Sequence, residues 1–411
     1  MAVTGSKNMS FEPGAPPAGG MIPLCVPEIR GREWEYVKDC LDTGWVSSVG
    51  SYVERFESGV AARAGQGHGV AVVNGTAALH MALKLAGVGP GDEVVMPSLT
   101  FIAPANAVHY LGAHPVFADA EPDYWQMDVE QVRGFLADKC EVENGVLRNR
   151  STGRRVAALL PVHILGHPVE MGALMELSER FGLPVVEDAT ESLGGTWRGR
   201  PLGGIGHFGC FSFNGNKILT TGGGGVLVAR DKQAAVRARY FTTQAKDDPV
   251  EYRHEEVGYN YRLTNLQAAM GCGQLENLEA YVEAKRRIAQ RYAAAFEGRP
   301  GLCFMREASW AHSAFWMSTV RVDPGFGGGS RNLMHQLGMR GIQTRPLWQP
   351  LHLSGAHRGA FHLGCSVAEG LWRDALSIPC SVGLTEEDQE RVITEVLMAS
   401  CRSRMGLGKQ L

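Results

Sequence analysis

Short apolar runs rich in β-branched residues alternate with helical stretches from residue 70 onward. The first run, at 70–73, is followed by Asn-Gly-Thr and by an amphipathic stretch from Ala77 to Ala86. Strands that alternate with helices at this spacing form βαβ units, so the chain is predicted to be an α/β protein with a mainly parallel sheet. A helix is expected over about 170–181, and further strands at 92–96, 115–119, 156–162, 184–188, 208–213 and 225–229.

The C-terminal third has a different character. A long helical pattern runs from Asn265 to Phe296, and it is followed by short strands such as 316–322 and by Gly and Pro breaks. A final helix is expected from about Glu386, because Thr385 supplies a capping hydroxyl and acidic residues fill the first turn. We therefore expect a flexible tail over 1–20, a large domain over 21–285 and a small α+β domain over 286–411.

The composition excludes several classes of protein. The 40 Lys and Arg nearly balance the 43 Asp and Glu, which argues against nucleic acid or a membrane surface as the main partner. No apolar run reaches the roughly 18 residues of a spanning helix, and the first 20 residues contain no signal-like apolar run. The nine scattered cysteines include no CxxC, so a cytoplasmic protein without disulfides or a zinc site is expected.

The segment Asn74-Gly75-Thr76 lies where a strand turns into a helix. The N–H groups and the positive dipole end at such a point can hold a phosphate, although a plain N-cap is an equally simple interpretation. Asp188 ends the expected strand at 184–188. It therefore lies at the sheet edge where ligands bind in open α/β sheets. Its carboxylate could pair with a cationic ring nitrogen or cap the following turn.

Lys217 lies among small and apolar residues, ahead of the glycine run 222–225. A lone lysine is usually a solvated surface charge, but a desolvated lysine has the depressed pKa that Schiff-base chemistry requires. Two other patterns carry less weight. The GxGxxG match at 204–209 precedes a strand instead of a helix, so it does not indicate a dinucleotide site. His163 and His167 follow a strand with no further ligand pattern, so no metal site is predicted.

The order of these features is more specific than any one of them. A phosphate-ready turn, a strand-end aspartate and then a lysine ahead of a glycine run match the needs of pyridoxal phosphate. This cofactor requires a phosphate cradle, a carboxylate for its ring nitrogen and a Schiff-base lysine.

On these residues the chain resembles the DegT/DnrJ/EryC1/StrS family of pyridoxal-phosphate-dependent nucleotide-sugar aminotransferases. The resemblance extends from Ile22 to about Val396 and implies the type I transferase fold, with a large mostly parallel-sheet domain and a small α+β domain. The matching segments are 74–76, Pro-Ser-Leu-Thr-Phe at 97–101, Glu-Asp-Ala at 187–189, Ser-Phe-Asn-Gly-Asn-Lys at 212–217 and the run 258–269.

The resemblance also implies roles for single residues. Lys217 would form the Schiff base with the cofactor and move the proton between cofactor and substrate carbons. Asp188 would keep the ring nitrogen protonated, and Phe101 would stack on the ring. The phosphate would be held by Gly75, Thr76 and Ser212, joined by Asn260 from the neighbouring subunit, so a homodimer with shared active sites is implied.

Further segments at 44–50, 140–155, 161–163, 190–194 and 344–348 are similar to one branch of the family. That branch acts on UDP- or GDP-linked 4-keto-6-deoxy-2-acetamido sugars in legionaminic acid and bacillosamine synthesis. The implied reaction is a ping-pong transfer of the amino group of L-glutamate to C4 of the keto sugar. The residues expected to contact the sugar nucleotide, with plain packing or surface ion pairing as the alternative, are Trp45, His163, Arg345 and Trp348.

Glu191 departs from the family pattern, which commonly has Gln or His near the phenolic oxygen of the cofactor. A carboxylate there would repel a phenolate unless one of the two is protonated. There are three alternative functions. Sugar dehydratases of this fold carry His at the position of Lys217, and a non-catalytic relative is expected to lack Lys217 or Asp188. An aminotransferase for a 3-keto sugar or another ketone in antibiotic assembly remains compatible with the sequence.

Overall fold

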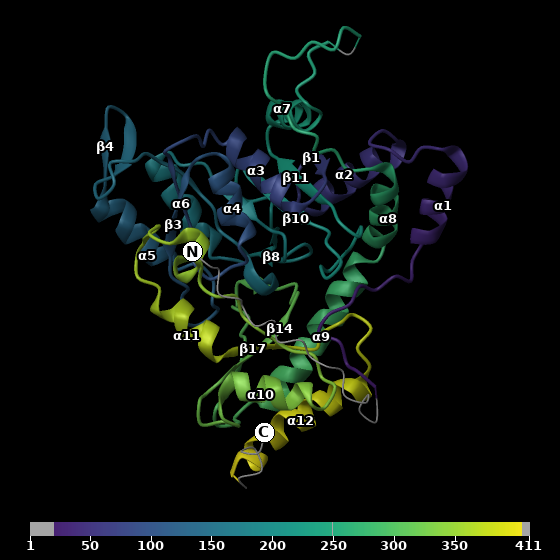
Figure 1. Ribbon diagram of the computed structural model, residues 1–411, viewed down its shortest axis with the longest axis vertical. Coiled ribbons are helices and arrows are strands. Elements are labelled where there is room, and N and C mark those ends of the chain that lie inside the picture. Colours follow the sequence, from purple (N-terminus) through teal and green to yellow (C-terminus); the bar gives the residue numbers. More distant parts are fainter. Residues whose placement is uncertain (1–19, 249, 405–411) are drawn as a thin grey trace, which may run out of the picture.

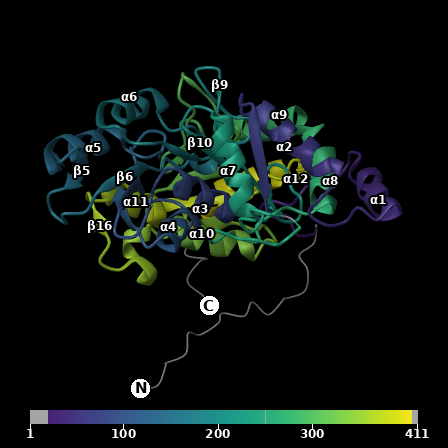
Figure 2. The same ribbon diagram turned by 90° about the horizontal axis from the view of Figure 1, so that it is seen from above.

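The computed structural model describes residues 20–248 and 250–404, so the tail expected over 1–20 lies outside the described residues except for Gly20. A large domain lies above a smaller one in Figure 1, and helix α9 (Leu278–Phe296) runs from one to the other. Figure 2 shows α1 (Glu33–Thr43) at one margin of the molecule and β5 (Val146–Asn149) at the other. No helix in the described ranges has the length and apolarity needed to cross a bilayer.

The large domain is built on one extended sheet. Its strands follow the order β1 (His68–Val72), β11 (Gly225–Ala229), β10 (Phe208–Ser212), β7 (Val186–Asp188), β6 (Val156–Leu159), β2 (Glu93–Pro97), β3 (His114–Ala118) and β16 (Phe361–His362). Parallel bridges from Leu159 to Val185 and from Val162 to Asp188 join its two halves. Strand β11 runs antiparallel to both its neighbours, whereas the other pairs are parallel. The predicted mainly parallel sheet is therefore confirmed.

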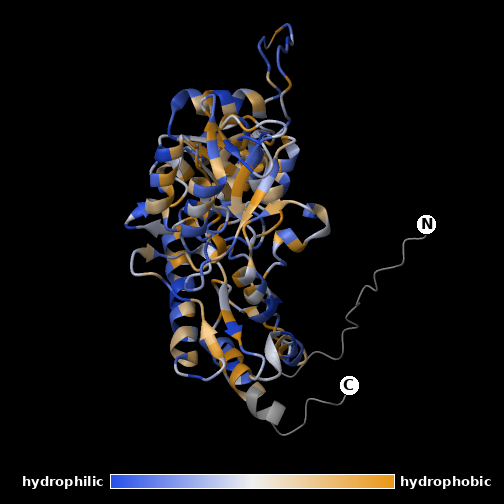
Figure 3. Cartoon of the chain, turned by 90° about the vertical axis from the view of Figure 1, so that its left-hand side faces the viewer, coloured by the Kyte–Doolittle hydropathy of each residue, from blue (hydrophilic) through white to orange (hydrophobic). Residues whose placement is uncertain are grey.

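Both faces of this sheet are buried. Successive side chains of a strand point to opposite faces, and in β2 Val94 and Met96 join one apolar core while Val95 joins another. Helix α3 (Gly75–Leu85) packs on β10 and β11, and α6 (Met171–Phe181) contributes to the second core. Figure 3 shows the apolar strands in the interior of this domain. The remaining helices are α2 (Ser51–Arg63), α4 (Ala103–Tyr110), α5 (Val129–Gly134), α7 (Lys232–Thr242) and α8 (Asn265–Leu275).

The small domain is an antiparallel sheet with helices. The strands lie in the order β12 (Leu302–Phe304), β14 (Ser318–Val322), β17 (Ala375–Ile378) and β15 (Arg345–Pro346). Its helices are α10 (Gly329–Gly338), α11 (Ser366–Asp374) and α12 (Glu386–Arg404). The hydroxyl of Thr385 accepts a hydrogen bond from the Asp388 N–H at 3.1 Å, which confirms the expected cap of the last helix. An α+β domain is therefore present, as expected. Two further small sheets are present. Strand β4 (Cys140–Glu143) pairs with β5, and β8 (Thr196–Trp197) lies between β9 (Arg200–Pro201) and β13 (Ala311–His312).

Some features differ from the sequence-based expectation. The helical pattern from Asn265 to Phe296 forms two helices, because the chain turns at Glu276 and Asn277 and the Asn277 side chain bonds back to the Gly273 carbonyl at 3.2 Å. The expected domain boundary at 285/286 falls inside α9.

The two domains also exchange segments. The N–H of Ile22 donates to the carbonyl of Gly341, and the N–H of Cys380 donates to the carbonyl of Leu24, each at 2.8 Å. The N-terminal stretch near residue 22 therefore lies on the small domain, although it was expected in the large one. In the opposite direction, β16 extends the large sheet.

Candidate active site

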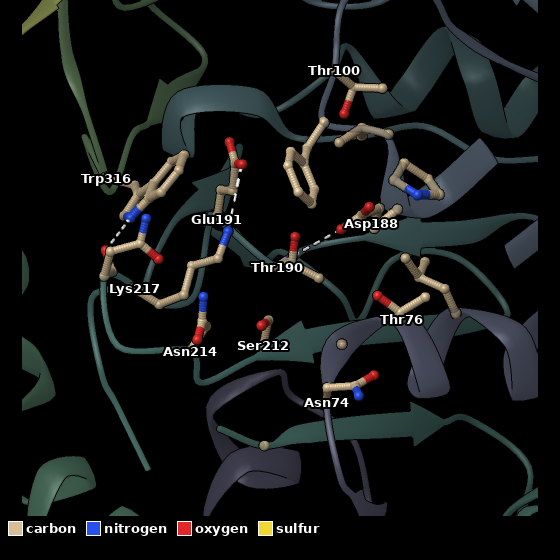
Figure 4. Close-up of a pocket in the computed structure, with 18 of the residues that line it drawn as sticks. Asn74, Thr76, Thr100, Asp188, Thr190, Glu191, Ser212, Asn214, Lys217 and Trp316 are labelled. Carbon is tan, nitrogen blue, oxygen red and sulfur yellow. Dashed lines mark hydrogen bonds and ion pairs between the residues drawn. The ribbon is translucent and has the colours of Figure 1, made fainter. Parts of the chain in front are cut away.

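The strands of the large sheet bring several polar side chains to one edge. Strand β7 ends at Asp188 and β10 ends at Ser212, while β1 is followed by Asn74. Because these strands are parallel, their carboxyl ends meet at the same edge. A cavity of about 290 Å³ opens there, and its lining includes Asn74, Gly75, Thr76, Thr100, Phe101, Asp188, Thr190, Glu191, Ser212, Asn214, Lys217, Trp316 and Trp348 (Figure 4).

One end of the cavity is the N-terminus of α3. The Asn74 side chain accepts a hydrogen bond from the Ala77 N–H at 2.8 Å, so Asn74 caps this helix, and the first N–H groups of a helix have no partner inside it. A Cβ atom at Gly75 would lie 2.7 Å from the Ser212 Cβ and 3.1 Å from the Thr190 Cγ2. The bare backbone at Gly75 therefore leaves an open helix end beside the Ser212 hydroxyl. Such an end suits a phosphate.

The lining of the cavity also includes the carboxylate of Asp188, whose residue is 2% exposed. Its Oδ1 accepts a hydrogen bond from the Thr190 N–H at 3.1 Å. Burial raises the pKa of Asp188 above its usual value, against the opposing effects of the Thr190 hydrogen bonds and of the charges of Lys217 and His163. The carboxylate thus both caps the turn and faces the cavity, so the two interpretations left open by the sequence are compatible. A cationic ring nitrogen placed there would offset its buried charge.

His163 does not line this cavity. It is fully buried, with its Nε2 3.0 Å from the Glu187 Oε2 and its Nδ1 accepting from the Val169 N–H at 3.1 Å. The predicted contact with substrate is therefore not supported, because both ring nitrogens are engaged within the protein. The carboxylate of Glu187 also accepts hydrogen bonds from the N–H groups of Gly203, Ile205 and Gly206. Part of the GxGxxG segment therefore has this structural role.

Lys217 extends into the cavity from the loop after β10 (Figure 4). Its side chain is 14% exposed, with Nζ 3.5 Å from the Glu191 Oε1 and 4.1 Å from the centre of the Trp316 ring. The Trp316 Nε1–H donates to the Asn216 carbonyl at 2.7 Å, and Trp348 stacks on Trp316 with centroids 6.5 Å apart. Lys217 is therefore an enclosed lysine against an aromatic wall, not a solvated surface charge.

Glu191 lies beside this lysine and is 5% exposed. Burial raises the pKa of Glu191 to about 7, although the nearby Lys217 lowers it. Its Oε2 accepts a hydrogen bond from the Leu165 N–H at 2.8 Å. The carboxyl group can therefore carry a proton near neutral pH, in which state it does not repel an anionic oxygen.

Some residues expected at the site lie elsewhere. Phe101 and Trp348 line the cavity, but Trp45 and Arg345 do not. Asn260 is exposed and lines a second cavity of about 410 Å³, together with Ser48, Arg239, Lys246 and Arg262. A single copy of the chain thus does not bring Asn260 to Lys217.

Sequence reasoning missed several side chains that line the cavity. Thr190 follows Asp188 by two residues, and this spacing is typical of a turn closed by an Asp side chain. The sequence could therefore have predicted that Thr190 lies beside Asp188. Trp316 lies about 100 residues from the Asn216 carbonyl that it contacts, and nothing in the local sequence links the two. Thr100 and Asn214 lie in segments that were quoted for the resemblance, but no role had been assigned to them.

Comparison with known proteins agrees with this geometry. The sequence profile of the DegT/DnrJ/EryC1/StrS aminotransferase family matches residues 27–397. The chain belongs to this family. Its relative EpsN from Bacillus subtilis, named as an aminotransferase, is 39% identical over 381 residues, which cover 92% of this chain and 95% of EpsN. GDP-perosamine synthase from Caulobacter vibrioides is 37% identical over 374 residues, with 90% and 96% of the two chains covered. The crystal structure of the aminotransferase TlmJ from Streptoalloteichus hindustanus matches with a TM-score of 0.84 and 30% identity, covering 93% of this chain and 100% of TlmJ.

As a sugar aminotransferase of this family, the protein has the type I transferase fold and depends on pyridoxal phosphate. The residues present fit that cofactor. The open N-terminus of α3 suits its phosphate, the buried Asp188 suits its ring nitrogen, and Lys217 is enclosed within the same cavity.

Proposed function

We propose that this enzyme transfers the amino group of L-glutamate to C4 of a UDP- or GDP-linked 4-keto-6-deoxy sugar. The observation that carries the proposal is one cavity that contains Lys217, Asp188 and the N-terminus of α3. A relative of 37% identity is named GDP-perosamine synthase, which supports a nucleotide-linked sugar as the acceptor. Within this class, the segments quoted for the legionaminic acid and bacillosamine branch favour a 2-acetamido sugar.

Pyridoxal phosphate supplies an electron sink for exchanging amino and keto groups when it is bound. In our proposal Lys217 anchors the cofactor, and its Nζ then takes and returns the proton of the reacting substrate carbon. Asp188 would keep the ring nitrogen of the cofactor protonated, while Gly75, Thr76 and Ser212 would bind its phosphate. The protonated Glu191 would donate a hydrogen bond to the phenolic oxygen of the cofactor. Its carboxyl group is held in place by the Leu165 N–H.

The mouth of the cavity offers aromatic surface for a nucleotide. Phe101 is 54% exposed although it lines the cavity, and Trp348 forms part of the same lining. We assign ring stacking on the cofactor to Phe101 and contact with the sugar nucleotide to Trp348. Trp45 and Arg345 are exposed and lie outside this cavity. In the proposal they contact either the nucleotide end of the substrate or a substrate bound by a second subunit.

We further propose a homodimer in which each subunit completes the site of its partner. Asn260 lies in a cavity with the cations Arg239, Lys246 and Arg262, apart from Lys217 of the same chain. The stretches 243–248 and 250–260 project beyond α7 in Figure 1, and the second carries the exposed apolar side chains of Val250, Tyr252 and Val257. Exposed apolar groups on a projecting segment are typical of protein interfaces. Arg239 and Arg262 both pair with Glu57, so among these three cations Lys246 is the one that would face the cofactor phosphate held by the second subunit.

The substrate assignment is tested with L-glutamate labelled with ¹⁵N in the amino group. Purified enzyme is incubated with UDP- and GDP-linked 4-keto-6-deoxy sugars, with and without a 2-acetamido group, and the product is analysed by NMR. We expect ¹⁵N at C4 of the sugar and release of 2-oxoglutarate. Labelling at C3, or transfer only from another amino donor, would contradict the proposal.

A matched pair of variants tests the lysine. Lys217→Ala should abolish transfer, whereas Lys232→Ala, at an exposed position that begins α7, should not change it. Turnover by Lys217→Ala at a rate near that of the wild type would contradict the assigned role.

The shared site is tested by complementation. Lys217→Ala and Asn260→Ala proteins are mixed, dissociated in mild denaturant and reassociated. A mixed dimer has one site that lacks both residues and one site that retains both, so activity should rise above that of either parent. No recovery in mixed dimers of confirmed composition would refute the shared site.

A further inference from the structure

Lys285 is a buried lysine that the proposed reaction does not use. It lies on α9 and is 1% exposed. Its Nζ lies 2.9 Å from the Trp316 carbonyl, 3.3 Å from the Cys25 Sγ and 3.7 Å from the Cys380 Sγ. Within residues 20–248 and 250–404 its polar contacts are these three groups, and no carboxylate is among them. A buried ammonium needs a countercharge, and here the two sulfur atoms are the groups able to supply one.

The two cysteines are not equivalent. Cys380 is 0% exposed, whereas Cys25 is half-buried. The neighbouring Cys380 side chain and the charge of Lys285 hold the pKa of Cys25 well below its usual range, against the opposing effect of burial. The pKa of Cys380 is raised in turn, because the sulfur of Cys25 and burial both disfavour a second thiolate. Cys25 is therefore the sulfur of the pair that ionises more readily, and Cys380 keeps its proton more firmly.

This cluster lies directly behind the wall of the active site. When protonated, the Cys25 thiol donates a hydrogen bond across 3.6 Å to the carbonyl of Asn216, the residue before Lys217. That same carbonyl accepts the Trp316 indole N–H, and the Trp316 backbone carbonyl accepts from Lys285. Any change of the sulfur chemistry therefore acts on groups that position the aromatic ring against Lys217.

We propose that Cys25, Cys380 and Lys285 form a redox-sensitive site in which peroxide converts the two cysteines into a disulfide. The Cys25 thiolate attacks hydrogen peroxide, so a sulfur–oxygen bond forms, the oxygen–oxygen bond breaks and hydroxide leaves. The Cys380 sulfur then attacks the sulfenic sulfur of Cys25, which forms the disulfide and breaks the sulfur–oxygen bond. The leaving hydroxide takes the Cys380 proton and departs as water. The two sulfurs lose two electrons in total, and peroxide accepts them.

The disulfide removes the countercharge of Lys285. Of the Trp316 carbonyl and the two sulfurs, the ammonium then keeps only the carbonyl as a polar partner. Burying a charge with so few partners is unfavourable. We expect the contacts of Trp316 and Asn216 to weaken and the transaminase to lose most of its activity. A dithiol reductant should restore it.

The first test is chemical and does not depend on the proposed function. The holoenzyme is treated with hydrogen peroxide and digested without reduction, and its peptides are mapped by mass spectrometry. We expect a cross-linked pair of peptides containing Cys25 and Cys380, with a mass lower by two hydrogens. The Cys380→Ser variant should stop at the sulfenic acid on Cys25, which dimedone labels. Oxidation elsewhere with Cys25 and Cys380 unchanged would overturn the proposal.

Cys303 provides the matched control, because it is an exposed cysteine of β12 outside this cluster. At pH 6 we expect iodoacetamide to label Cys25 at least about tenfold faster than Cys303, although Cys25 is less accessible. Faster labelling of Cys303 would overturn the thiolate assignment.

Activity is the last readout, with each protein compared with its own untreated sample. Wild type and Cys303→Ser should lose activity in peroxide and recover in dithiothreitol, whereas Cys25→Ser should resist. Equal losses in all three would show that the cluster is not responsible. A failure of the proposed substrate assignment would leave the cross-linking result intact.

Discussion

Replacing Glu191 by glutamine should change the pH dependence of stability in the cofactor-free protein. The folded carboxyl group holds its proton up to a pKa of about 7, because it is buried, whereas an ordinary glutamate releases it near 4.5. Between these pH values the folded state binds more protons than the unfolded state, so stability decreases as the pH rises. The total decrease corresponds to about 3 kcal/mol, at roughly 1.4 kcal/mol for each tenfold change in proton affinity.

Glutamine cannot ionise and resembles the protonated glutamate in shape. At pH 5 the free energies of unfolding of wild type and Glu191→Gln should therefore differ little for electrostatic reasons. At pH 8 the wild type bears the cost of a buried charge, and the variant should gain about 2–3 kcal/mol relative to the comparison at pH 5. Both free energies are measured by urea unfolding at one protein concentration after removal of the cofactor.

Glu297→Gln is the control, because Glu297 is exposed at the end of α9. Its difference from wild type should be the same at both pH values. The reasoning is refuted if Glu191→Gln changes stability by the same amount at pH 5 and pH 8, since the carboxyl group would then ionise alike in the folded and unfolded chains.

Three further outcomes are expected. Asp188→Asn should slow the half-reaction with glutamate by about 10–100-fold, which corresponds to the loss of a hydrogen bond to a charged group. The rate is measured by stopped-flow absorbance, and an unchanged rate would contradict the pairing of Asp188 with the ring nitrogen. Gly75→Ala places a Cβ 2.7 Å from the Ser212 Cβ, so overpacking should cost about 1–3 kcal/mol and weaken cofactor binding. Gly134→Ala, where nothing lies within 4 Å, should instead leave cofactor affinity unchanged in the same titration. Asn260→Ala should release cofactor faster during dialysis, and equal retention would argue against its role across the subunit interface.

The order of strands and helices could be predicted because each depends on local pattern. The run at 225–229 forms β11 with the same bounds, and the run at 208–213 forms β10 to within a residue. The direction of β11 could not be predicted in this way, since an antiparallel strand buried among parallel ones has the same apolar composition as they do. The break at Glu276 and Asn277 was missed for a related reason, because the apolar pattern continues across it and no Gly or Pro stands at the turn itself.

At the site, the sequence indicated residues whose function requires a special local position. Gly75 at a helix start and Asp188 at a strand end are both of this kind, and both line the cavity. His163 was expected to contact the substrate, but its ring faces Glu187 in the interior. The motif gives the position of His163 along the chain and not the direction of its side chain. Trp316 and Lys285 were missed because their importance arises from contacts across the two domains, which no local pattern encodes.

The exchange of segments between the domains also constrains biosynthesis. The stretch around Ile22 leaves the ribosome long before its partners Gly341 and Cys380 have been made. The large sheet likewise lacks its edge strand until residues 361–362 have been made. A nascent chain that stops at 285 would therefore present an unpaired N-terminal stretch and an open sheet edge, two features that invite aggregation. Fragments cut at that point are expected to need the other part of the chain for solubility, so the two domains form a single folding unit.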